Sequence, residues 1–173
     1  MAPQVKFSVF RPGADRIHYV QEEDVRILLS RLPIEVWHRL RAVHFNDQSD
    51  TRLLGYVNRG RREIALCALP PRVGLTKALR NGQRAEQFGA RRGHKWPAVA
   101  VRRFMLYHVF LHELGHLQPV RKNARSLRLK FAREKLAEDF AVYWCSRLWS
   151  EPFSHPDPVH NPPPAEEIQS LLL

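Results

Sequence analysis

Hydrophobic and polar positions recur with different periods along the chain, and these periods predict where helices and strands lie. The segment Glu22–Ser30 begins with acidic residues and continues with apolar residues at helical spacing, which predicts a short helix. Pro33 interrupts the pattern, and Ile34–Leu40 is predicted to form a second short helix. The turn Arg59–Arg61 separates two extended apolar segments and is predicted to form a tight hairpin. The pattern predicts three strands, at Arg41–Phe45, Leu53–Asn58 and Glu63–Leu69.

The second half of the chain is predicted to be mainly helical. Ala98–Leu117 is mostly apolar and predicts a long helix that enters the core. A further helix is predicted over Ser126–Trp149. Its apolar residues at helical spacing are Leu129, Leu136, Phe140, Tyr143 and Leu148. Arg72–Trp96, which precedes the first of these helices, is predicted to be a long loop or a partly helical insertion. Ser150–Pro164 is proline-rich and predicted to be extended, and Ala165–Leu173 forms a short terminal segment.

This order of elements predicts the fold class and the domain organisation. Short helices, a small sheet and then two long helices predict an α+β architecture. A chain of 173 residues has the size of a single domain. We expect one domain over residues 1–150 and a proline-rich C-terminal tail over residues 151–173.

The segment His112–His116, with the sequence HELGH, is the one stretch that indicates a specific chemistry. Residues i and i+4 of a helix lie one turn apart on the same face, so His112 and His116 can bind one metal ion. Glu113 lies beside the pair, where it can accept a proton from a water molecule that the metal activates. The alternative is a chance match on an ordinary amphipathic helix.

The residues around this motif favour the metal site. The apolar run Val99–Leu111 is long enough to carry the motif into a core, where buried histidines need partners for their ring nitrogens. Gly115 costs a helix roughly 1 kcal/mol relative to alanine, which is tolerable where another element or a substrate must come close. Pro119 is expected to end the helix soon after the second histidine.

A catalytic zinc ion usually has three protein ligands and an open position for water. The residues after the motif that could supply the third ligand are Glu134, Glu138, Asp139, His155 and His160. Glu134 and Glu138 lie one turn apart on the predicted second long helix, so either could reach the metal while the other holds a histidine ring. The alternative is that both are solvent-exposed acids that form ion pairs with neighbouring Lys and Arg residues.

On these residues the chain resembles the gluzincin metallopeptidases, whose third ligand is a glutamate on the helix after the HExxH helix. The Glu-x-Phe-Ala pattern of lethal-factor-like zincins matches Glu138–Ala141 and implies Glu138 as the ligand. The Glu-x-x-Ala-Asp/Asn pattern of thermolysin-like gluzincins implies Glu134, although Glu138 then stands where Asp or Asn is expected. We favour Glu138, with Glu134 as the alternative. The resemblance also implies a Zn²⁺ cofactor and a small antiparallel or mixed sheet packed on the motif helix and the glutamate helix.

The remaining histidines and one cysteine receive structural predictions. The metzincin pattern needs a glycine and a third histidine that Leu117–Lys122 lacks. His108, one turn before the motif, is expected to be a core residue or to support a metal ligand. His155 and His160 are expected at the surface of the tail. Cys67 is expected to point inward from its strand.

The expected activity is hydrolysis of peptide bonds in a protein substrate by zinc-activated water, with Glu113 as general base. In such enzymes an edge strand aligns the substrate by backbone pairing, and Glu63–Leu69 is the candidate here. The sequence identifies neither the oxyanion-stabilising residue nor the residues that select a substrate.

An excess of basic residues suggests a second kind of partner. The chain has 28 Lys and Arg against 17 Asp and Glu, a net charge of +11, and the excess gathers in segments 72–95 and 121–135. These segments flank the motif helix and could attract a nucleic acid or an acidic partner. The alternatives are therefore a nucleic-acid-associated protease, or a basic DNA- or RNA-binding module with a structural metal site. Solvated basic faces without a partner are the simplest alternative.

The rest of the composition is that of a globular protein, with a hydrophobic share of 44%. No run approaches the roughly 18 apolar residues of a membrane span, and Met1–Lys6 has no apolar core typical of a signal peptide. Cys67 and Cys145 are too few for a disulfide scaffold. We expect a cytoplasmic protein without a membrane partner.

Overall fold

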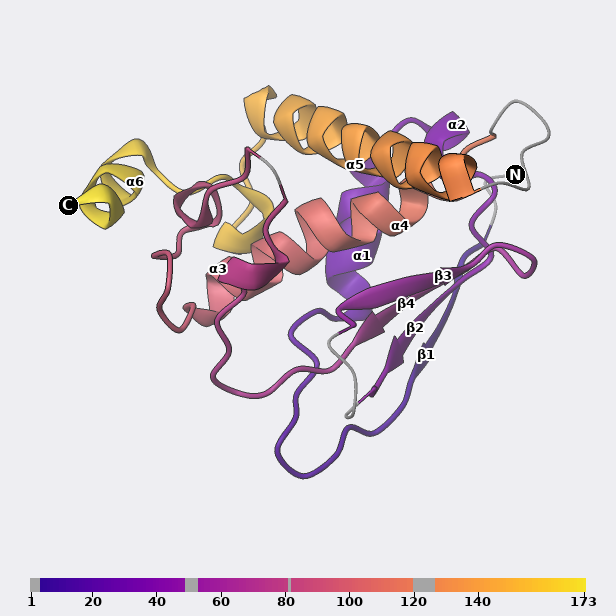
Figure 1. Cartoon of the computed structure of the whole chain (residues 1–173), viewed down its shortest axis with the longest axis horizontal. Helices are drawn as coiled ribbons and strands as arrows, with labels where there is room; N and C mark the ends of the chain where they lie inside the picture. Colours follow the sequence, from indigo (N-terminus) through magenta and orange to yellow (C-terminus); the bar gives the residue numbers. More distant parts are fainter. Residues whose placement is uncertain (1–3, 49–52, 81, 120–126) are drawn as a thin grey trace.

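The computed structural model describes residues 4–48, 53–80, 82–119 and 127–173, and it has an α+β fold. A small mixed sheet lies on one side, and the long helices cross above it (Figure 1). The strands, in chain order, are β1 (Lys6–Val9), β2 (Ala42–Asn46), β3 (Gly55–Asn58) and β4 (Glu63–Cys67). The predicted fold class is confirmed at this level.

The order of strands in the sheet is β1-β2-β4-β3, so the order in space differs from the order in the chain. β1, β2 and β4 are parallel to one another, and β3 pairs with β4 in the antiparallel direction. The expectation that Glu63–Leu69 forms the edge strand is therefore wrong, because β4 lies between β2 and β3. The edge strand beside the helices is β3, and β1 is the opposite edge.

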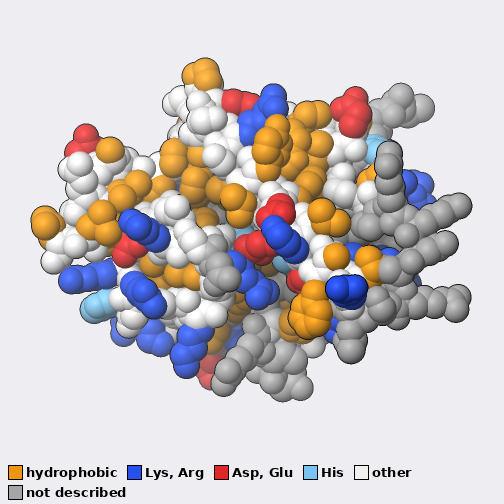
Figure 2. Space-filling view, turned by 45° about the horizontal axis from the view of Figure 1, so that its top comes forward, with side chains coloured by type: hydrophobic (Ala, Val, Ile, Leu, Met, Phe, Trp, Pro, Cys, Tyr) orange, Lys and Arg blue, Asp and Glu red, His pale blue; other side chains and the backbone are white. Residues whose placement is uncertain are grey.

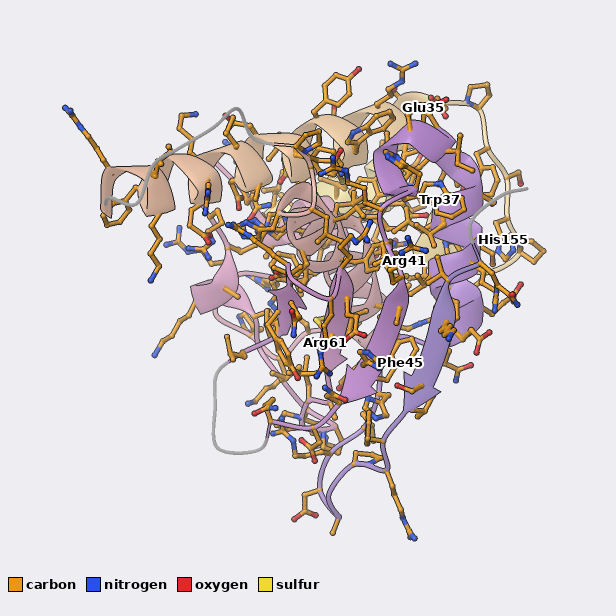
Figure 3. All side chains as sticks on the ribbon, turned by 90° about the vertical axis from the view of Figure 1, so that its right-hand side faces the viewer. Glu35, Trp37, Arg41, Phe45, Arg61 and His155 are labelled. Carbon is orange, nitrogen blue, oxygen red and sulfur yellow. The ribbon has the colours of Figure 1, made fainter. Side chains whose placement is uncertain are left out.

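The sheet contains one strand that the pattern did not predict. Lys6–Val9 pairs with β2 from Lys6↔Ala42 to Val9↔Phe45, and this segment is too short to show a clear alternation. The other strands lie close to their predicted positions. Figure 3 shows the sheet with Phe45 on β2 and Arg41 just before that strand. The predicted hairpin between β3 and β4 is present, and Arg62 in its turn has a left-handed backbone with φ of 59°.

Two helices precede the sheet's second strand, as predicted. α1 covers Glu22–Arg31 and α2 covers Ile34–Trp37. The Asp24 carboxylate accepts a hydrogen bond from the backbone amide of Gln21 at 3.0 Å, which caps the first turn of α1. Val25 and Leu28 are fully buried and anchor α1 in the core.

The predicted motif helix forms a continuous helical run of three parts. These are α3 (Ala98–Phe104), a π-helical stretch η3 (Met105–Phe110) and α4 (Leu111–Gly115). Most of its side chains are buried, as the apolar run predicts. A π-helical turn inside an α-helix often lies at a functional site, and this one ends immediately before the histidine motif.

The second long helix, α5 (Leu127–Ser150), crosses α4 (Figure 1). Its buried side chains are Ala137, Ala141 and Leu148, whereas Leu136 and Tyr143 are more than half exposed. The predicted apolar face of this helix is therefore wrong in part. Figure 2 shows hydrophobic side chains gathered on the outer surface over this helix. The exposed apolar residues of α5 are Phe131, Leu136, Val142 and Tyr143.

The insertion and the C-terminal segment are partly helical. Arg72–Trp96 contains the short 3₁₀ helices η1 (Thr76–Ala78) and η2 (Ala85–Phe88). The tail contains η4 (Pro158–His160) and ends with α6 (Ala165–Leu172). η4 packs on α3, and Val159 belongs to the main core, so the tail is not detached from the domain.

The tail also corrects one prediction about a histidine. His160 is completely buried rather than on the surface, and its Nδ1 lies 3.0 Å from the Tyr107 hydroxyl. Among the described residues, no helix is long and apolar enough to cross a membrane.

Candidate metal centre

A glycine allows the two long helices to approach each other at the motif. A Cβ atom on Gly115 would lie 2.9 Å from the Cα atom of Ala137 and 3.2 Å from the Cβ atom of Phe140. Only a residue without a side chain therefore fits at this crossing. This close contact brings Glu134 and Glu138, on the neighbouring turns of α5, against the two histidines of α4. The sequence-based interpretation of Gly115 as a point of close approach is confirmed.

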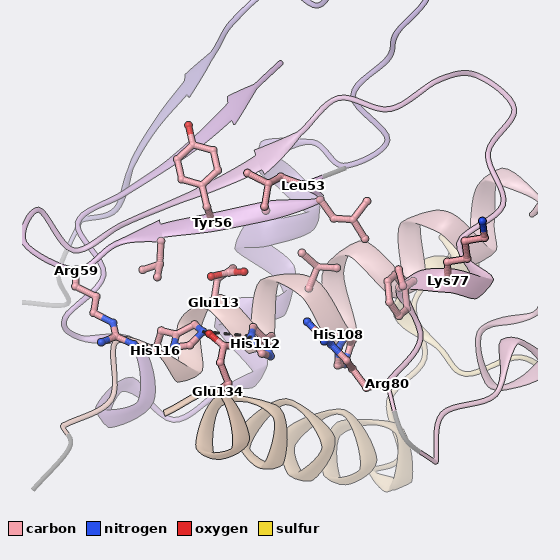
Figure 4. Close-up of a pocket in the computed structure, with 16 residues that line it drawn as sticks. Leu53, Tyr56, Arg59, Lys77, Arg80, His108, His112, Glu113, His116 and Glu134 are labelled. Atoms are coloured by element: carbon pink, nitrogen blue, oxygen red, sulfur yellow. Dashed lines mark hydrogen bonds and ion pairs between the residues drawn. The ribbon is translucent and has the colours of Figure 1, made fainter. Parts of the chain in front are cut away.

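Three side chains converge on one point beside the motif (Figure 4). The Nε2 atoms of His112 and His116 lie 3.2 Å apart. One carboxylate oxygen of Glu134 lies 3.3 Å from Nε2 of His112, and the other lies 3.2 Å from Nε2 of His116. Each of these atoms can donate a lone pair to a cation, and their lone pairs repel one another unless a proton or cation lies between them.

Glu138 contacts the other ring nitrogen of His112. Its Oε2 atom lies 3.0 Å from Nδ1 of His112, and its Oε1 atom lies 3.5 Å from Nε2 of His108. A hydrogen bond from Nδ1 to this carboxylate fixes the ring and leaves Nε2 free to bind a metal. These distances favour Glu134 over Glu138 as the third ligand, which reverses the order that the sequence pattern favours.

His108 links the Glu138 carboxylate to the insertion Arg72–Trp96. It is buried, as expected, and the Gln83 side-chain amide donates a hydrogen bond of 2.8 Å to its Nδ1 atom. The remaining ring proton then lies on Nε2, facing Glu138. Burial is the main cause that lowers the pKa of His108 to about 4, so the ring is neutral near pH 7. His108, His112 and Glu138 form a second group whose ligand atoms lie within 4.8 Å of one another.

The two motif histidines have opposite pKa shifts. Burial opposes protonation of His112, but the hydrogen bond to Glu138 and the nearby carboxylates outweigh it and raise its pKa. Burial also dominates at His116 and lowers the pKa of that ring to about 4, despite the charge of Glu134. His116 therefore presents a neutral ring, which is the form that binds metal.

Glu113 lies on the side of α4 that faces β3 (Figure 4). Burial is the main cause that raises its pKa to about 7, and the negative charge of Glu134 adds to the shift. The carboxylate lines a cavity of about 520 Å³ between β3, the insertion and α4. His112, His116 and Glu134 line the same cavity, so Glu113 and the three ligand candidates face one space.

Two arginines at this cavity were not identified from the sequence. Arg59, in the turn after β3, donates a hydrogen bond of 3.0 Å from Nη2 to Nδ1 of His116. Arg80, in the insertion, lies 4.0 Å from the Glu138 carboxylate. Nothing in the pattern around either residue predicts these contacts, because they join segments far apart in the chain. Figure 2 shows basic and acidic side chains around the hollow, with histidine atoms deeper in it.

The structure separates the remaining candidates from the centre. His155 and His160 are not among the residues that line this cavity. Asp139 is exposed and pairs with Lys135 at 2.9 Å, one turn along the outer face of α5. Cys67 is buried, as expected. No family model, curated protein or solved structure matches the chain.

Proposed function

We propose that this protein is a zinc-dependent metallopeptidase, in which His112, His116 and Glu134 hold the ion and Glu113 is the general base. The single observation that carries the proposal is the convergence of these side chains: the two Nε2 atoms lie 3.2 Å apart, and each lies 3.2–3.3 Å from one oxygen of the Glu134 carboxylate. Ligands at the corners of a tetrahedron, about 2.0–2.2 Å from a central zinc ion, lie about 3.3–3.6 Å apart. The spacing therefore suits zinc with little movement of the side chains.

The donor set supports the same ion. Two imidazole nitrogens and one carboxylate are ligands that zinc accepts, and three protein ligands leave a position open. When bound, zinc lowers the pKa of water and polarises the carbonyl of a peptide bond. The Glu138 carboxylate would hold the His112 ring by Nδ1, which is a usual support for a histidine ligand.

Glu113 has the properties of a general base for this reaction. Its pKa of about 7 allows the carboxylate to take a proton from water near neutral pH and to give it to the leaving amine. Its position between α4 and β3 puts it beside a peptide bound in the cavity. Asp at this position would be one methylene too short to reach the same point.

The edge strand β3 would align the substrate. Among the described residues, β3 pairs only with β4, so its outer backbone groups face the cavity side without a strand partner. An extended peptide can add to such an edge by backbone hydrogen bonds, with alternate side chains pointing toward the pockets. In this proposal β3 aligns the substrate, in place of the segment Glu63–Leu69 that the sequence analysis favours. The domain that we propose is therefore a small zincin-like peptidase.

Two measurements test the proposal together. Protein purified without chelator and supplied with zinc should hold about one zinc ion per chain by elemental analysis, and His112→Ala/His116→Ala should hold none. The zinc-loaded protein should cleave an unfolded protein such as reduced casein, and a chelator should stop the cleavage. Stoichiometric zinc without any cleavage would indicate that the zinc site is structural and not catalytic. Absence of bound zinc would remove the proposal.

The basic residues support a second candidate, a protease that acts on nucleic-acid-bound proteins. Lys77, Arg80 and Arg59 line the cavity from both ends, although residues 121–126 of the second basic segment lie outside the described residues. Added DNA or RNA should accelerate cleavage at low salt if this candidate is correct. A cleavage rate that DNA and RNA leave unchanged would favour the simple peptidase.

A further inference from the structure

A second cavity, of about 390 Å³, adjoins the proposed catalytic centre at the end of β3. Arg59 and His116 line both this cavity and the cavity over the candidate metal centre, so the two spaces adjoin at these residues. The arginines that line it are Arg39, Arg59, Arg62 and Arg133. None of the described residues that line it is acidic. We call this space the arginine cavity.

The four arginines of the arginine cavity lack ion-pair partners within the described part of the chain. No carboxylate of the described residues forms an ion pair with any of its four arginines. Elsewhere in the fold, by contrast, Arg16 pairs with Asp47, and Arg102 pairs with both Asp24 and Asp157. The Nε atom of Arg133 is buried and has no hydrogen-bond partner in the described structure. Guanidinium groups are donors only, so such a cavity suits an anion with several acceptor oxygens.

The fold brings these arginines together from distant segments. Arg59 and Arg62 belong to the turn between β3 and β4, Arg39 precedes β2, and Arg133 lies on α5 one residue before Glu134. Arg62 holds its place with a left-handed backbone, and its carbonyl accepts a hydrogen bond from the Arg41 amide at 2.9 Å. This bond ties the turn to the start of β2.

We infer that the arginine cavity binds an acidic side chain of the polypeptide substrate, on the amino-terminal side of the cleaved bond. The inference rests on the proposed peptidase function. A peptide that pairs antiparallel with β3 runs from Arg59 toward Leu53, since β3 itself runs toward Arg59. Its residues before the metal centre would then enter the arginine cavity, where a carboxylate can form paired hydrogen bonds with guanidinium groups.

A nucleic acid fits this cavity less well than an acidic peptide. Proteins that bind single strands combine a basic groove with aromatic rings on which bases stack. The described residues that line the arginine cavity include no Phe, Tyr or Trp. Its position at the end of an open strand edge, rather than along an extended basic stripe, also favours one acidic side chain over a phosphate backbone.

Cleavage profiling tests this inference without a known substrate. The zinc-loaded protein is incubated with a complex library of peptides, and mass spectrometry identifies the bonds that it cleaves. We expect Asp and Glu to be enriched about fivefold or more within a few residues on the amino-terminal side of these bonds. Arg39→Gln/Arg62→Gln should lose the enrichment and still cleave other bonds. The matched control Arg41→Gln/Arg61→Gln removes the same charge from neighbouring exposed residues outside the cavity and should retain it (Figure 3).

Three outcomes would overturn the inference. They are cleavage without acidic enrichment, enrichment only on the carboxyl-terminal side, and enrichment that survives Arg39→Gln/Arg62→Gln. A library left uncut by zinc-loaded protein is instead a failure of the proposed function.

In that case, binding of a fluorescent hexaglutamate peptide and of a labelled single-stranded oligonucleotide to zinc-loaded Glu113→Gln protein tests the cavity directly. Peptide binding that is lost in Arg39→Gln/Arg62→Gln protein would support an acidic polypeptide as the ligand. Oligonucleotide binding without peptide binding would overturn it.

Discussion

The Cα atom of Ala137 lies 2.9 Å from the position that a Cβ atom on Gly115 would occupy. This distance is too short for any side chain, so the approach of α5 to α4 depends on the glycine. Because Glu134 lies one turn before Ala137, the same approach sets the distance between the Glu134 carboxylate and the two histidines. Packing of two helices thus determines the geometry of the proposed metal centre.

Gly115→Ala should therefore weaken both the fold and the proposed zinc site. Forcing a methyl group into this contact should cost about 1–3 kcal/mol of the free energy of unfolding. It should also lower zinc affinity, because Glu134 moves away from His112 and His116. Thermal unfolding and competition with a chelator measure the two effects. Gly60→Ala is the control, since a Cβ atom there meets nothing closer than 3.6 Å. Equal zinc affinity in Gly115→Ala and wild type would contradict the role of this contact.

The order of the strands shows where sequence reasoning ends. Alternation of apolar residues located β2, β3 and β4 within a residue or two. It could not reveal that β4 inserts between β2 and β3, because strand order depends on long-range pairing that no local period records. The sequence therefore indicates Glu63–Leu69 as the edge strand, whereas β3 is the edge strand in the structure.

The same limit explains the buried face of α5. Apolar residues occur around much of this helix, so spacing alone favoured Leu136 and Tyr143 as core residues. The structure buries Ala137 and Ala141 instead, because only small side chains fit where the helix meets Gly115. His160 was misplaced for a related reason. Its proline-rich surroundings indicate an exposed loop, but the ring lies between Tyr107 and Asp24.

The choice between Glu134 and Glu138 also lay beyond the sequence. Both residues lie on the face of α5 that meets the motif, and the position of the helix along its axis decides which carboxylate reaches the Nε2 atoms. The geometry of the motif itself, by contrast, follows from its spacing in the sequence. Two histidines four residues apart on a helix must lie close together, and the predicted pairing of His112 with His116 is confirmed.

Matched glutamine variants should separate the two glutamates. Glu134→Gln removes a charged ligand candidate and should lower zinc affinity more than Glu138→Gln does. Glu138→Gln should lower it by about 10–100-fold, the usual effect of losing a carboxylate that orients a histidine ligand. Zinc affinity of each variant, measured by competition with a chelator of known affinity, decides the order. A larger loss in Glu138→Gln would restore Glu138 as the third ligand.

Glu113→Gln should separate binding from catalysis. The amide keeps the shape of the side chain but cannot take a proton, so zinc content and thermal stability should stay close to wild type. The rate of peptide cleavage should fall by about 10²–10⁴-fold. Glu35→Gln, at an exposed position on α2, serves as the control. Substantial cleavage by Glu113→Gln would exclude Glu113 as the base.

An ion-pair network around the buried Asp24, outside the candidate metal centre, should make stability depend on pH. Burial of Asp24 opposes its ionisation, but the neighbouring His160 ring, the Gln21 amide and the Arg102 charge outweigh it and hold its pKa below 3.8. Oδ1 of Asp24 lies 2.9 Å from Nη2 of Arg102. A carboxyl group with a lowered pKa stabilises the folded state above its unfolded pKa. That stabilisation is lost as the pH falls through the folded pKa.

Asp24→Asn should therefore destabilise the protein by about 1–3 kcal/mol at neutral pH. The difference from wild type should stay constant down to about pH 5 and shrink below about pH 4. Denaturant unfolding between pH 3 and pH 7 measures it. Asp15→Asn, at an exposed position, should show no comparable difference. A difference in the free energy of unfolding between wild type and Asp24→Asn that grows at acidic pH would contradict this prediction.

Arg59 should oppose zinc binding, because its hydrogen bond uses the wrong nitrogen of His116. Arg59 donates to Nδ1 of His116 at 3.0 Å, so Nδ1 accepts and the proton of the neutral ring lies on Nε2. A metal ligand role requires a free lone pair on Nε2 and the proton on Nδ1. Zinc must therefore displace Arg59 from the ring.

Arg59→Gln should consequently bind zinc roughly 3–10-fold more tightly than wild type. The change removes a positive charge next to the site, and the glutamine oxygen can accept the hydrogen bond that Nδ1 then donates. Arg61→Gln removes the same charge from an exposed position in the same turn and should leave the affinity within about twofold. Chelator competition at constant pH and ionic strength compares the three proteins. Weaker binding by Arg59→Gln would mean that Arg59 supports the zinc site, and equal binding by all three proteins would mean that the bond to Nδ1 has no energetic role.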